Sequence, residues 1–151
     1  AGRTRLQTLG GAESVLTGPT GERNVLSWHA PKKVWLYGGN LQQAFAALTV
    51  LAASGMEAIV AADSPLAAHQ AGLEGLIRIS TDPTAEGISH VIALENLPLA
   101  VKQQLAGSDG ALVKILPSEQ GVDVLQLFEE ISCSINTTAA GGNASLMAMA
   151  D

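Results

Sequence analysis

The chain is poor in cysteine, and it contains no long apolar run. Cys133 is the only cysteine among 151 residues, which excludes an internal disulfide and is compatible with a reducing cytosol. No apolar run approaches the roughly 18 to 20 residues that cross a bilayer, and the N-terminus lacks the apolar core of a signal peptide. We therefore expect a soluble, cytoplasmic protein without a transmembrane segment.

Positive charge is also scarce. Eight Lys and Arg stand against 14 Asp and Glu, the formal net charge is −6, and Lys32 and Lys33 form the only adjacent basic pair. Such a chain has little electrostatic attraction for a phosphate backbone. We therefore expect no direct binding of nucleic acid.

The balance of apolar and charged residues indicates a partner surface. Apolar residues make up 47% of the sequence and charged residues 15%, whereas about 25% charged is usual. Part of the surface is therefore expected to contact protein. A length of 151 residues suits one domain. Because the chain begins with Ala1 and not Met, we interpret it as a fragment with a lead segment, 1–12, and a single domain, 13–151.

The first patterned region predicts a β-hairpin flap over residues 13–29. Strand-like residues at 13–16 and 24–28 flank Gly18-Pro19-Thr20-Gly21, in which proline presets φ and glycine relieves the turn. Two exposed strands without a covering layer are marginally stable. The hairpin is therefore expected to lie on a neighbouring surface.

Residues 33–131 alternate between short apolar runs and amphipathic segments, which predicts the body of the domain. Strands are expected at 34–37, 58–62, 77–79, 90–94 and 111–115, and helices at 41–52, 65–75, 98–106 and 122–131. Strands that alternate with helices at these lengths form a parallel sheet covered on both faces. The predicted fold class is α/β, a Rossmann-like three-layer αβα domain with about five parallel strands.

Candidate cofactor-binding residues follow the first two strands of this body. Gly38 and Gly39 stand where a dinucleotide-binding fold places its phosphate loop, and Asp63 stands where a carboxylate would hold ribose hydroxyls. The full fingerprint needs three spaced glycines, and the later two are missing. Asp63 also begins an ordinary helix-start signal. We expect a structural turn and no cofactor in this domain, with nucleotide binding as the alternative.

Catalytic and metal-binding constellations are not evident. Cys133 lies in a predicted strand with no nearby group in sequence to lower its pKa, so we interpret it as a buried, inert thiol. His29, His69 and His90 lack metal-ligand spacing. We therefore predict no catalytic residue and no metal site.

The C-terminal residues 132–149 are the most distinctive stretch. A strand-like opening leads into small residues around Gly141-Gly142 and then into Leu146 and Met147, where most domains fray. Small residues allow close backbone approach, and the last two side chains can fill pockets. We expect a docked C-terminal tail. This stretch and residues 18–24 resemble the C-terminal region of the long bifunctional flavoenzymes called proline utilization A, or PutA.

Between these ends, the chain is similar to a degenerate aldehyde dehydrogenase pattern. Residues 53–66 resemble a segment in which that family uses a lysine to hold the adenosine ribose, but alanine stands there, at Ala61 or Ala62. Residues 94–97 replace a glycine-containing pyrophosphate loop, and residues 114–117 replace the segment with the catalytic glutamate. The resemblance thus implies an aldehyde-dehydrogenase-superfamily-like domain without catalysis.

The resemblance also implies a role in bacterial proline catabolism. The parent oxidoreductases oxidise proline to glutamate, with FAD in proline dehydrogenase and NAD in glutamate semialdehyde dehydrogenase. The domain would pack on the catalytic aldehyde dehydrogenase module of the same polypeptide and help close the substrate-channelling tunnel or support assembly. The parent is expected in the cytoplasm, with peripheral association with the inner membrane. The interaction residues expected here are Gly18, Pro19, Thr20, Gly21, Asn136, Thr137, Thr138, Gly141, Gly142, Asn143, Leu146 and Met147.

Two other classes stay open at this point. One is a functional NAD-binding domain of a dehydrogenase. The other is a receiver or flavodoxin-like module, although the first body strand ends in Tyr37-Gly38-Gly39 and not in paired acids or a phosphate loop rich in Ser and Thr. Self-association of the isolated domain through uncovered apolar surfaces is also expected.

Overall fold

Five apolar runs form one parallel sheet in the computed structural model, which describes residues 11–31 and 33–137. The strands are β3 (Val34–Tyr37), β4 (Ala58–Ala61), β5 (Ile77–Ser80), β6 (His90–Ala93) and β7 (Lys114–Pro117). Their spatial order is β5-β4-β3-β6-β7, which is the order 3-2-1-4-5 of a Rossmann fold when the body strands are counted along the chain. The predicted Rossmann-like α/β fold is confirmed.

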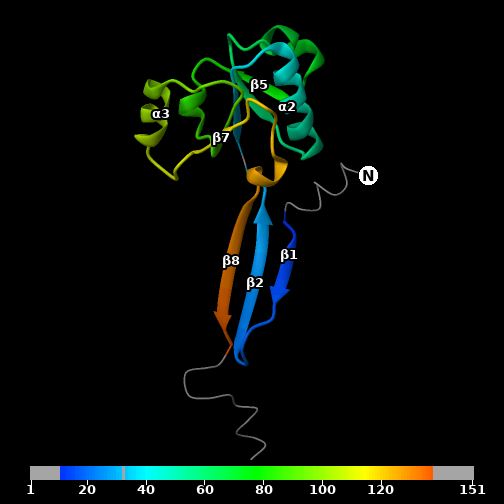
Figure 1. Ribbon diagram of the computed structural model, residues 1–151, viewed down its shortest axis with the longest axis vertical. Helices are drawn as coiled ribbons and strands as arrows, with labels where there is room; N and C mark the ends of the chain where they lie inside the picture. Colours follow the sequence, from blue (N-terminus) through cyan, green and yellow to red (C-terminus); the bar gives the residue numbers. More distant parts are fainter. Residues whose placement is uncertain (1–10, 32, 138–151) are drawn as a thin grey trace, which may run out of the picture.

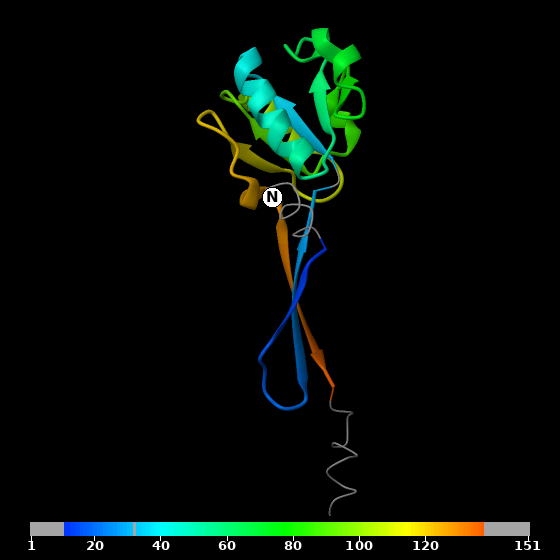
Figure 2. The same ribbon diagram turned by 90° about the vertical axis from the view of Figure 1, so that its right-hand side faces the viewer.

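The alternation of side chains along each strand builds a core on both faces of the sheet. Val34 and Leu36 of β3 pack on the face covered by α2 (Leu41–Ala53), whereas Trp35 packs on the opposite face with Leu105 of α3 (Leu99–Ala106). Three 3-10 helices complete the covering layers: η1 (Ala67–Gly72), η2 (Pro83–Glu86) and η3 (Val124–Leu127). The sheet therefore lies between two helical layers, as Figures 1 and 2 show.

Helix α2 is fixed at both ends by its own sequence. The Asn40 side chain accepts a hydrogen bond from the Gln43 N–H at 2.9 Å, and the Gln43 side chain accepts one from the Asn40 N–H at 3.0 Å. This reciprocal pair is a capping box. Gly55 follows the helix with φ +76°, a left-handed conformation that glycine adopts without strain. The helix therefore begins directly after the carboxyl end of β3.

A second, antiparallel sheet extends from the body as an arm (Figures 1 and 2). It consists of β1 (Glu13–Leu16), β2 (Glu22–His29) and β8 (Glu129–Asn136), in the order β1-β2-β8. At the tip, the Glu22 N–H donates to the Pro19 carbonyl at 3.1 Å and Gly21 has φ +91°. The predicted hairpin of residues 13–29 is confirmed. We call these three strands the arm.

The helix predicted over 122–131 is wrong. Val124–Leu127 form a single 3-10 turn, and the following residues enter β8, which pairs with β2 from Glu129 to Asn136. The spacing of Val122, Leu125 and Phe128 matches a helix period, but residues 129–136 lie opposite β2 in antiparallel register, and this pairing bonds alternate backbone groups of the segment to β2. Residues 129–131 therefore lie in the arm.

Two other elements differ from the sequence prediction in length or position. The helix predicted over 65–75 is only the 3-10 helix Ala67–Gly72, because the Ser64 hydroxyl accepts from the Leu66 N–H and holds a turn there. The strand predicted at 111–115 is β7, Lys114–Pro117, and the apolar Leu112 lies 85% exposed in the loop before it. Among the described residues, no helix has the length and apolarity needed to cross a membrane.

Candidate functional site

The carboxyl edge of the parallel sheet gathers the residues predicted as cofactor ligands. Gly38 and Gly39 follow β3, Asp63 follows β4 and Glu95 follows β6, and all four line a cavity of about 190 Å³. Strand order reverses between β3 and β6, and this is where a Rossmann fold binds its dinucleotide. The structure therefore brings Gly38, Gly39 and Asp63 together at the expected position.

Glu95 lines this crevice and contacts the glycine turn. Its Oε2 accepts a hydrogen bond from the Gly39 N–H at 3.3 Å. A Cβ atom on Gly38 would overlap the Glu95 side chain, and one on Gly39 would lie 2.7 Å from the Leu94 Cβ. The two glycines have φ +67° and +78°. Their lack of a side chain thus serves the packing of the turn against residues 94 and 95.

Three other backbone donors at the start of α2 also have partners within the chain. The Asn40 and Gln43 N–H groups bond to each other's side chains, and the Ala44 N–H donates to the Asn40 carbonyl at 2.9 Å. A dinucleotide-binding loop presents such groups to a pyrophosphate. In this chain the N–H groups of Asn40, Gln43 and Ala44 are engaged by its own side chains and backbone.

The charge of the crevice is negative. Burial raises the pKa of the Tyr37 hydroxyl, and the carboxylates of Glu95 and Asp63 raise it further because they oppose a second negative charge. Among the described residues that line the cavity, none is Lys or Arg. A phosphate would therefore meet two carboxylates and no cation.

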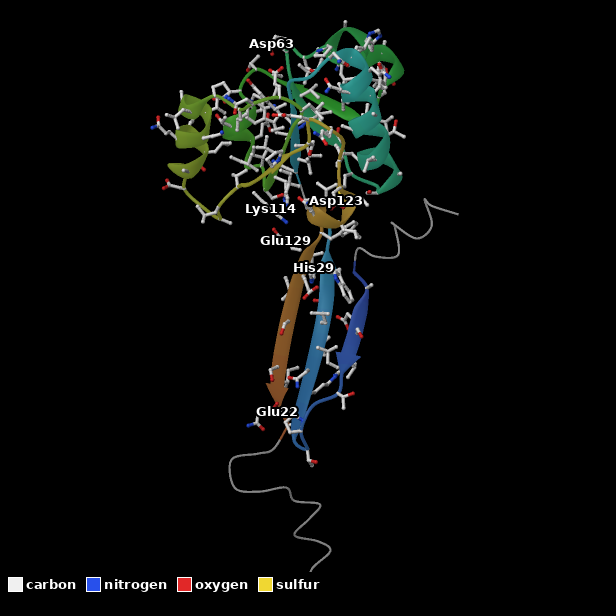
Figure 3. All side chains as sticks on the ribbon, in the orientation of Figure 1. Glu22, His29, Asp63, Lys114, Asp123 and Glu129 are labelled. Atoms are coloured by element: carbon white, nitrogen blue, oxygen red, sulfur yellow. The ribbon has the colours of Figure 1, made fainter. Side chains whose placement is uncertain are left out.

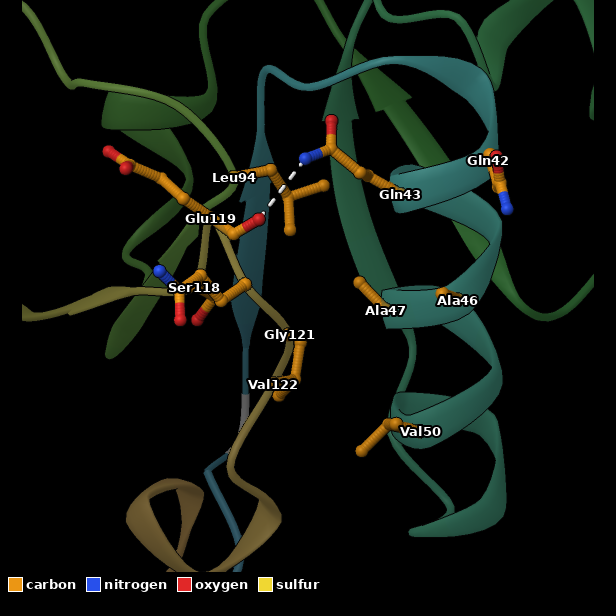
Figure 4. Close-up of a pocket in the computed structure, with 11 residues that line it drawn as sticks. Gln42, Gln43, Ala46, Ala47, Val50, Leu94, Ser118, Glu119, Gly121 and Val122 are labelled. Carbon is orange, nitrogen blue, oxygen red and sulfur yellow. Dashed lines mark hydrogen bonds between the residues drawn. The ribbon is translucent and has the colours of Figure 1, made fainter.

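A second cavity lies beside α2, between that helix and the segment after β7 (Figure 4). It has a volume of about 370 Å³, and Gln43 spans its upper end by donating from Nε2 to the Glu119 carbonyl at 3.2 Å. Ala46, Val50 and Val122 make its walls mainly apolar. It contains no group suited to acid-base chemistry except the Glu119 side chain.

The arm carries apolar side chains that nothing covers in the described part of the chain. Val15 is 64% exposed, Ile131 47% and Ile135 46%. Every residue of β8 is exposed. Figure 3 shows the arm standing clear of the body, with Glu129 and His29 at its root and Glu22 near its tip.

This arrangement corrects the prediction for Cys133. The cysteine is free and exposed in β8, where a buried thiol was expected. The strand prediction for this residue is right, but the strand belongs to an arm that no layer covers within residues 11–31 and 33–137.

The three histidines lie in separate places. His29 ends β2 and its Nε2 lies 3.0 Å from the Ser27 hydroxyl, while the His69 ring contacts Phe45 with centroids 5.7 Å apart. His90 is fully buried, with Nδ1 3.1 Å from the Ser89 hydroxyl. Within residues 11–31 and 33–137, no group of three or more His, Cys, Asp and Glu could share a metal ion.

The fully buried His90 lies at the arm's root and is electrostatically perturbed. Burial lowers the pKa of His90, the Glu129 carboxylate raises it in part, and Lys114 lowers it. Lys114 is held by a 2.6 Å bond from Nζ to the Gln126 carbonyl. The imidazole is therefore kept neutral at the junction of body and arm.

The predicted interaction residues divide between the arm and the undescribed end of the chain. Gly18, Pro19, Thr20 and Gly21 form the arm's tip, and Asn136 and Thr137 end the strand beside it. Thr138, Gly141, Gly142, Asn143, Leu146 and Met147 lie outside the described residues, as does the predicted docked tail.

Comparison with known proteins gives consistent relatives. No protein-family model matches the chain. It is 31% identical over 154 residues to the bifunctional protein PutA of Rhizobium meliloti, which covers 92% of this chain and 13% of that protein. It is 30% identical over 167 residues to PutA of Salmonella typhimurium, which covers 97% of this chain and 13% of that protein. PutA of Escherichia coli K12 is 29% identical over 151 residues, which covers 91% of this chain and 11% of that protein.

Solved structures of proline utilization A are also similar. A Bradyrhizobium japonicum PutA variant matches with a TM-score of 0.48 and 22% identity over 74% of this chain and 14% of its own. A structure of the bifunctional PutA protein matches with the same TM-score, identity and coverage. The chain thus spans only a small part of the length of its relatives. It is homologous to one segment of the bacterial PutA proteins.

Proposed function

We propose that this chain is a non-catalytic domain of a PutA enzyme, which oxidises proline to glutamate with FAD and NAD bound elsewhere in the polypeptide. In this proposal the body is a rigid holder, and the arm and C-terminal residues pack on the catalytic aldehyde dehydrogenase module. That packing helps close the tunnel through which the aldehyde intermediate passes. The single domain comprises residues 13–151 after a lead segment.

The absence of a cofactor in this domain is supported by the crevice at the carboxyl edge. The Glu95 carboxylate accepts a hydrogen bond from the Gly39 N–H at 3.3 Å, and the capping box engages the N–H groups of Asn40 and Gln43. Displacing Glu95 with a phosphate would exchange one anion for another while Asp63 lines the same cavity. Backbone donors that a pyrophosphate would use are engaged by the chain's own groups, and the nearby carboxylates repel a phosphate, so binding at Gly38, Gly39 and Asp63 is disfavoured.

The docking role is carried by the arm. A three-stranded sheet becomes stable when one face packs against another layer, yet Val15, Ile131 and Ile135 remain about half or more exposed. An uncovered apolar sheet of this kind marks a protein contact. The arm therefore supplies the surface on which another module of the parent would lie.

Closing a tunnel is a task that such a surface can perform. A reactive aldehyde is retained when its route excludes water. The arm's tip, Gly18 to Gly21, and the end of β8, Asn136 and Thr137, lie side by side through the 2.7 Å bond from the Thr137 N–H to the Gly21 carbonyl. In the proposal this end of the arm, with residues 138–151, forms part of the tunnel wall.

The test uses the full-length parent enzyme. Deleting residues 136–151 is expected to lower coupled conversion of proline to glutamate and to release the aldehyde intermediate, while each half-reaction assayed alone keeps its rate. A second variant, Val15→Asp, places a charge on the arm at a position 64% exposed, so it disturbs docking without opening the core. Leu112→Asp is the matched control, because Leu112 is 85% exposed in a loop of the body. Unchanged coupling and no leakage in the deletion and in Val15→Asp would reject the docking role.

A further inference from the structure

The outer edge of β8 is an unusual feature of the arm. In the order β1-β2-β8, β8 pairs on one side only among the residues that the structure describes. It is eight residues long, whereas the opposite edge strand, β1, has four. Proteins usually protect edge strands with short length, proline or inward-pointing charge. The central part of β8, Ile131 to Ile135, has none of these devices.

The hydrogen-bond pattern shows which backbone groups face outward. The Thr137 N–H donates to the Gly21 carbonyl, so residues 21 and 137 form a hydrogen-bonded pair of the antiparallel ladder. Such pairs alternate with non-hydrogen-bonded ones. In the printed register, Cys133 with Val25 is therefore a bonded pair, and Ser132 and Ser134 direct their N–H and carbonyl groups to the outer edge.

The partner strand β2 confirms this alternation independently. The Trp28 N–H donates to the Ala12 carbonyl on the side of β1. Even-numbered residues of β2 thus bond to β1 and odd-numbered ones bond to β8. The outward direction of Ser132 and Ser134 follows from both neighbours.

The side chains of β8 have a pattern that is symmetric about its centre. Ile131, Cys133 and Ile135 lie on one face of the sheet, at equal spacing on either side of Cys133. If a second β8 pairs antiparallel about Cys133, each Ile131 lies opposite an Ile135 and the two cysteines lie opposite each other. A self-complementary strand of this kind is what a two-fold interface requires.

The charges of β8 also favour antiparallel over parallel pairing of the two strands. Glu129 and Glu130 stand at the root of β8, and its last residues are uncharged. Antiparallel pairing keeps the acidic ends of the two strands about 20 Å apart, beyond the Debye length of about 8 Å in physiological salt. Parallel pairing would place the four carboxylates together.

We infer that two copies of this chain pair through the outer edges of β8, antiparallel and in register at Cys133, to form one six-stranded sheet. The row Val15, Val25 and Cys133 then continues across the two-fold axis into the same residues of the second copy. The pairing uses the edge of the sheet and leaves its faces available. It therefore does not rest on the proposed docking of the arm.

The register makes a sharp prediction for cross-linking. Cys133 would occupy a non-hydrogen-bonded pair across the new interface, in which Cα atoms are about 4.5 Å apart. That separation falls within the range of about 4.4 to 6.8 Å for disulfides. Mild oxidation of the 151-residue chain is expected to give a covalent dimer through Cys133. With Cys133→Ser and Ile131→Cys combined, oxidation should give no covalent dimer, because the new cysteine lies opposite Ile135.

A pair of proline variants tests the edge. Ser134→Pro removes an outward N–H of β8 without removing a bond to β2, and Glu13→Pro makes the equivalent change on the outer edge of β1. Sedimentation over a concentration series is expected to show dimers for the natural chain and Glu13→Pro, and monomers for Ser134→Pro. Circular dichroism checks that each variant is folded. A natural chain that stays monomeric, a dimer that oxidation does not link at Cys133, or a dimer that survives Ser134→Pro in folded protein would overturn the inference.

Discussion

Substitution of Gly39 tests whether this glycine is required for packing against its neighbours or for leaving space for a ligand. We consider Gly39→Ala together with Gly55→Ala as its control. Both glycines have left-handed backbones of nearly equal φ, +78° and +76°. A Cβ on Gly39 would lie 2.7 Å from the Leu94 Cβ, whereas a Cβ on Gly55 would have no heavy atom within 4 Å. The two substitutions therefore introduce similar backbone strain but differ in the contacts that the new Cβ atom would make.

The expected losses follow from these two contributions. Alanine in a left-handed conformation costs about 1 to 2 kcal/mol, and the stiffer unfolded chain returns about 0.4 to 1 kcal/mol. Gly55→Ala should therefore lower the free energy of unfolding by about 1 kcal/mol. Gly39→Ala adds overpacking against Leu94, typically about 1 to 3 kcal/mol, for a total of about 2 to 4 kcal/mol.

Urea denaturation followed by circular dichroism measures both variants on the same chain. The reasoning is refuted if the two losses agree within about 0.5 kcal/mol, because the close approach of the β3 turn to residue 94 would then have no energetic role. It is also refuted if Gly39→Ala is the milder change. Either result would reopen the reading in which Gly39 leaves space for a ligand.

Three further predictions concern the stability of the body. Because burial lowers the pKa of His90, the unfolded chain binds more protons in mild acid, so the free energy of unfolding should decrease as pH falls from about 6.5. The His90→Phe variant should lack this part of the pH dependence when its unfolding is measured over the same pH range. An identical pH profile in the two proteins would contradict the prediction. Asn40→Ala should cost about 1 kcal/mol through loss of the capping box, and combining it with Gln43→Ala should cost less than the sum, since the two side chains act as one unit; strict additivity in thermal unfolding would argue against the box. Leu51→Ala, at a position 0% exposed, should cost about 2 to 5 kcal/mol, whereas Leu112→Ala, at 85% exposed, should change unfolding by no more than about 0.5 kcal/mol.

Much of the body was predictable because its signals are local. Continuous apolar runs such as residues 58–61 indicate strands buried on both faces, and Asn40 with Gln43 marks the start of α2. The alternation of strands and helices then specifies a parallel sheet. These features depend on residues close together in the sequence, so one sequence is enough to find them.

The arm was only half predictable. The hairpin of residues 13–29 carries its own turn signal, but each residue of β8 lies 100 or more positions from its partner in β2. The residues around Glu129 to Ile131 give no local signal that they pair with β2, and the spacing of the apolar residues before them favours a helix. The same non-local pairing explains why Cys133 was expected to be buried: a strand that reads as apolar need not have a covering layer.

The candidate site shows a similar limit. Sequence reasoning placed Gly38, Gly39 and Asp63 at one edge of the sheet and noted that residues 94–97 replace a glycine-containing pyrophosphate loop. It could not find the bond between Glu95 and the Gly39 N–H, because that contact depends on β6 lying beside β3. Sheet order, which brings residues 39 and 95 together, is the information that the local pattern lacks.

The central claim is that the switch-point crevice of this Rossmann-like body is closed to nucleotides by the chain's own groups. The most direct measurement is a calorimetric titration of the 151-residue chain with NAD. The account predicts no saturable heat up to millimolar NAD. Saturable binding with a micromolar dissociation constant that is lost on substitution of Asp63 would contradict it.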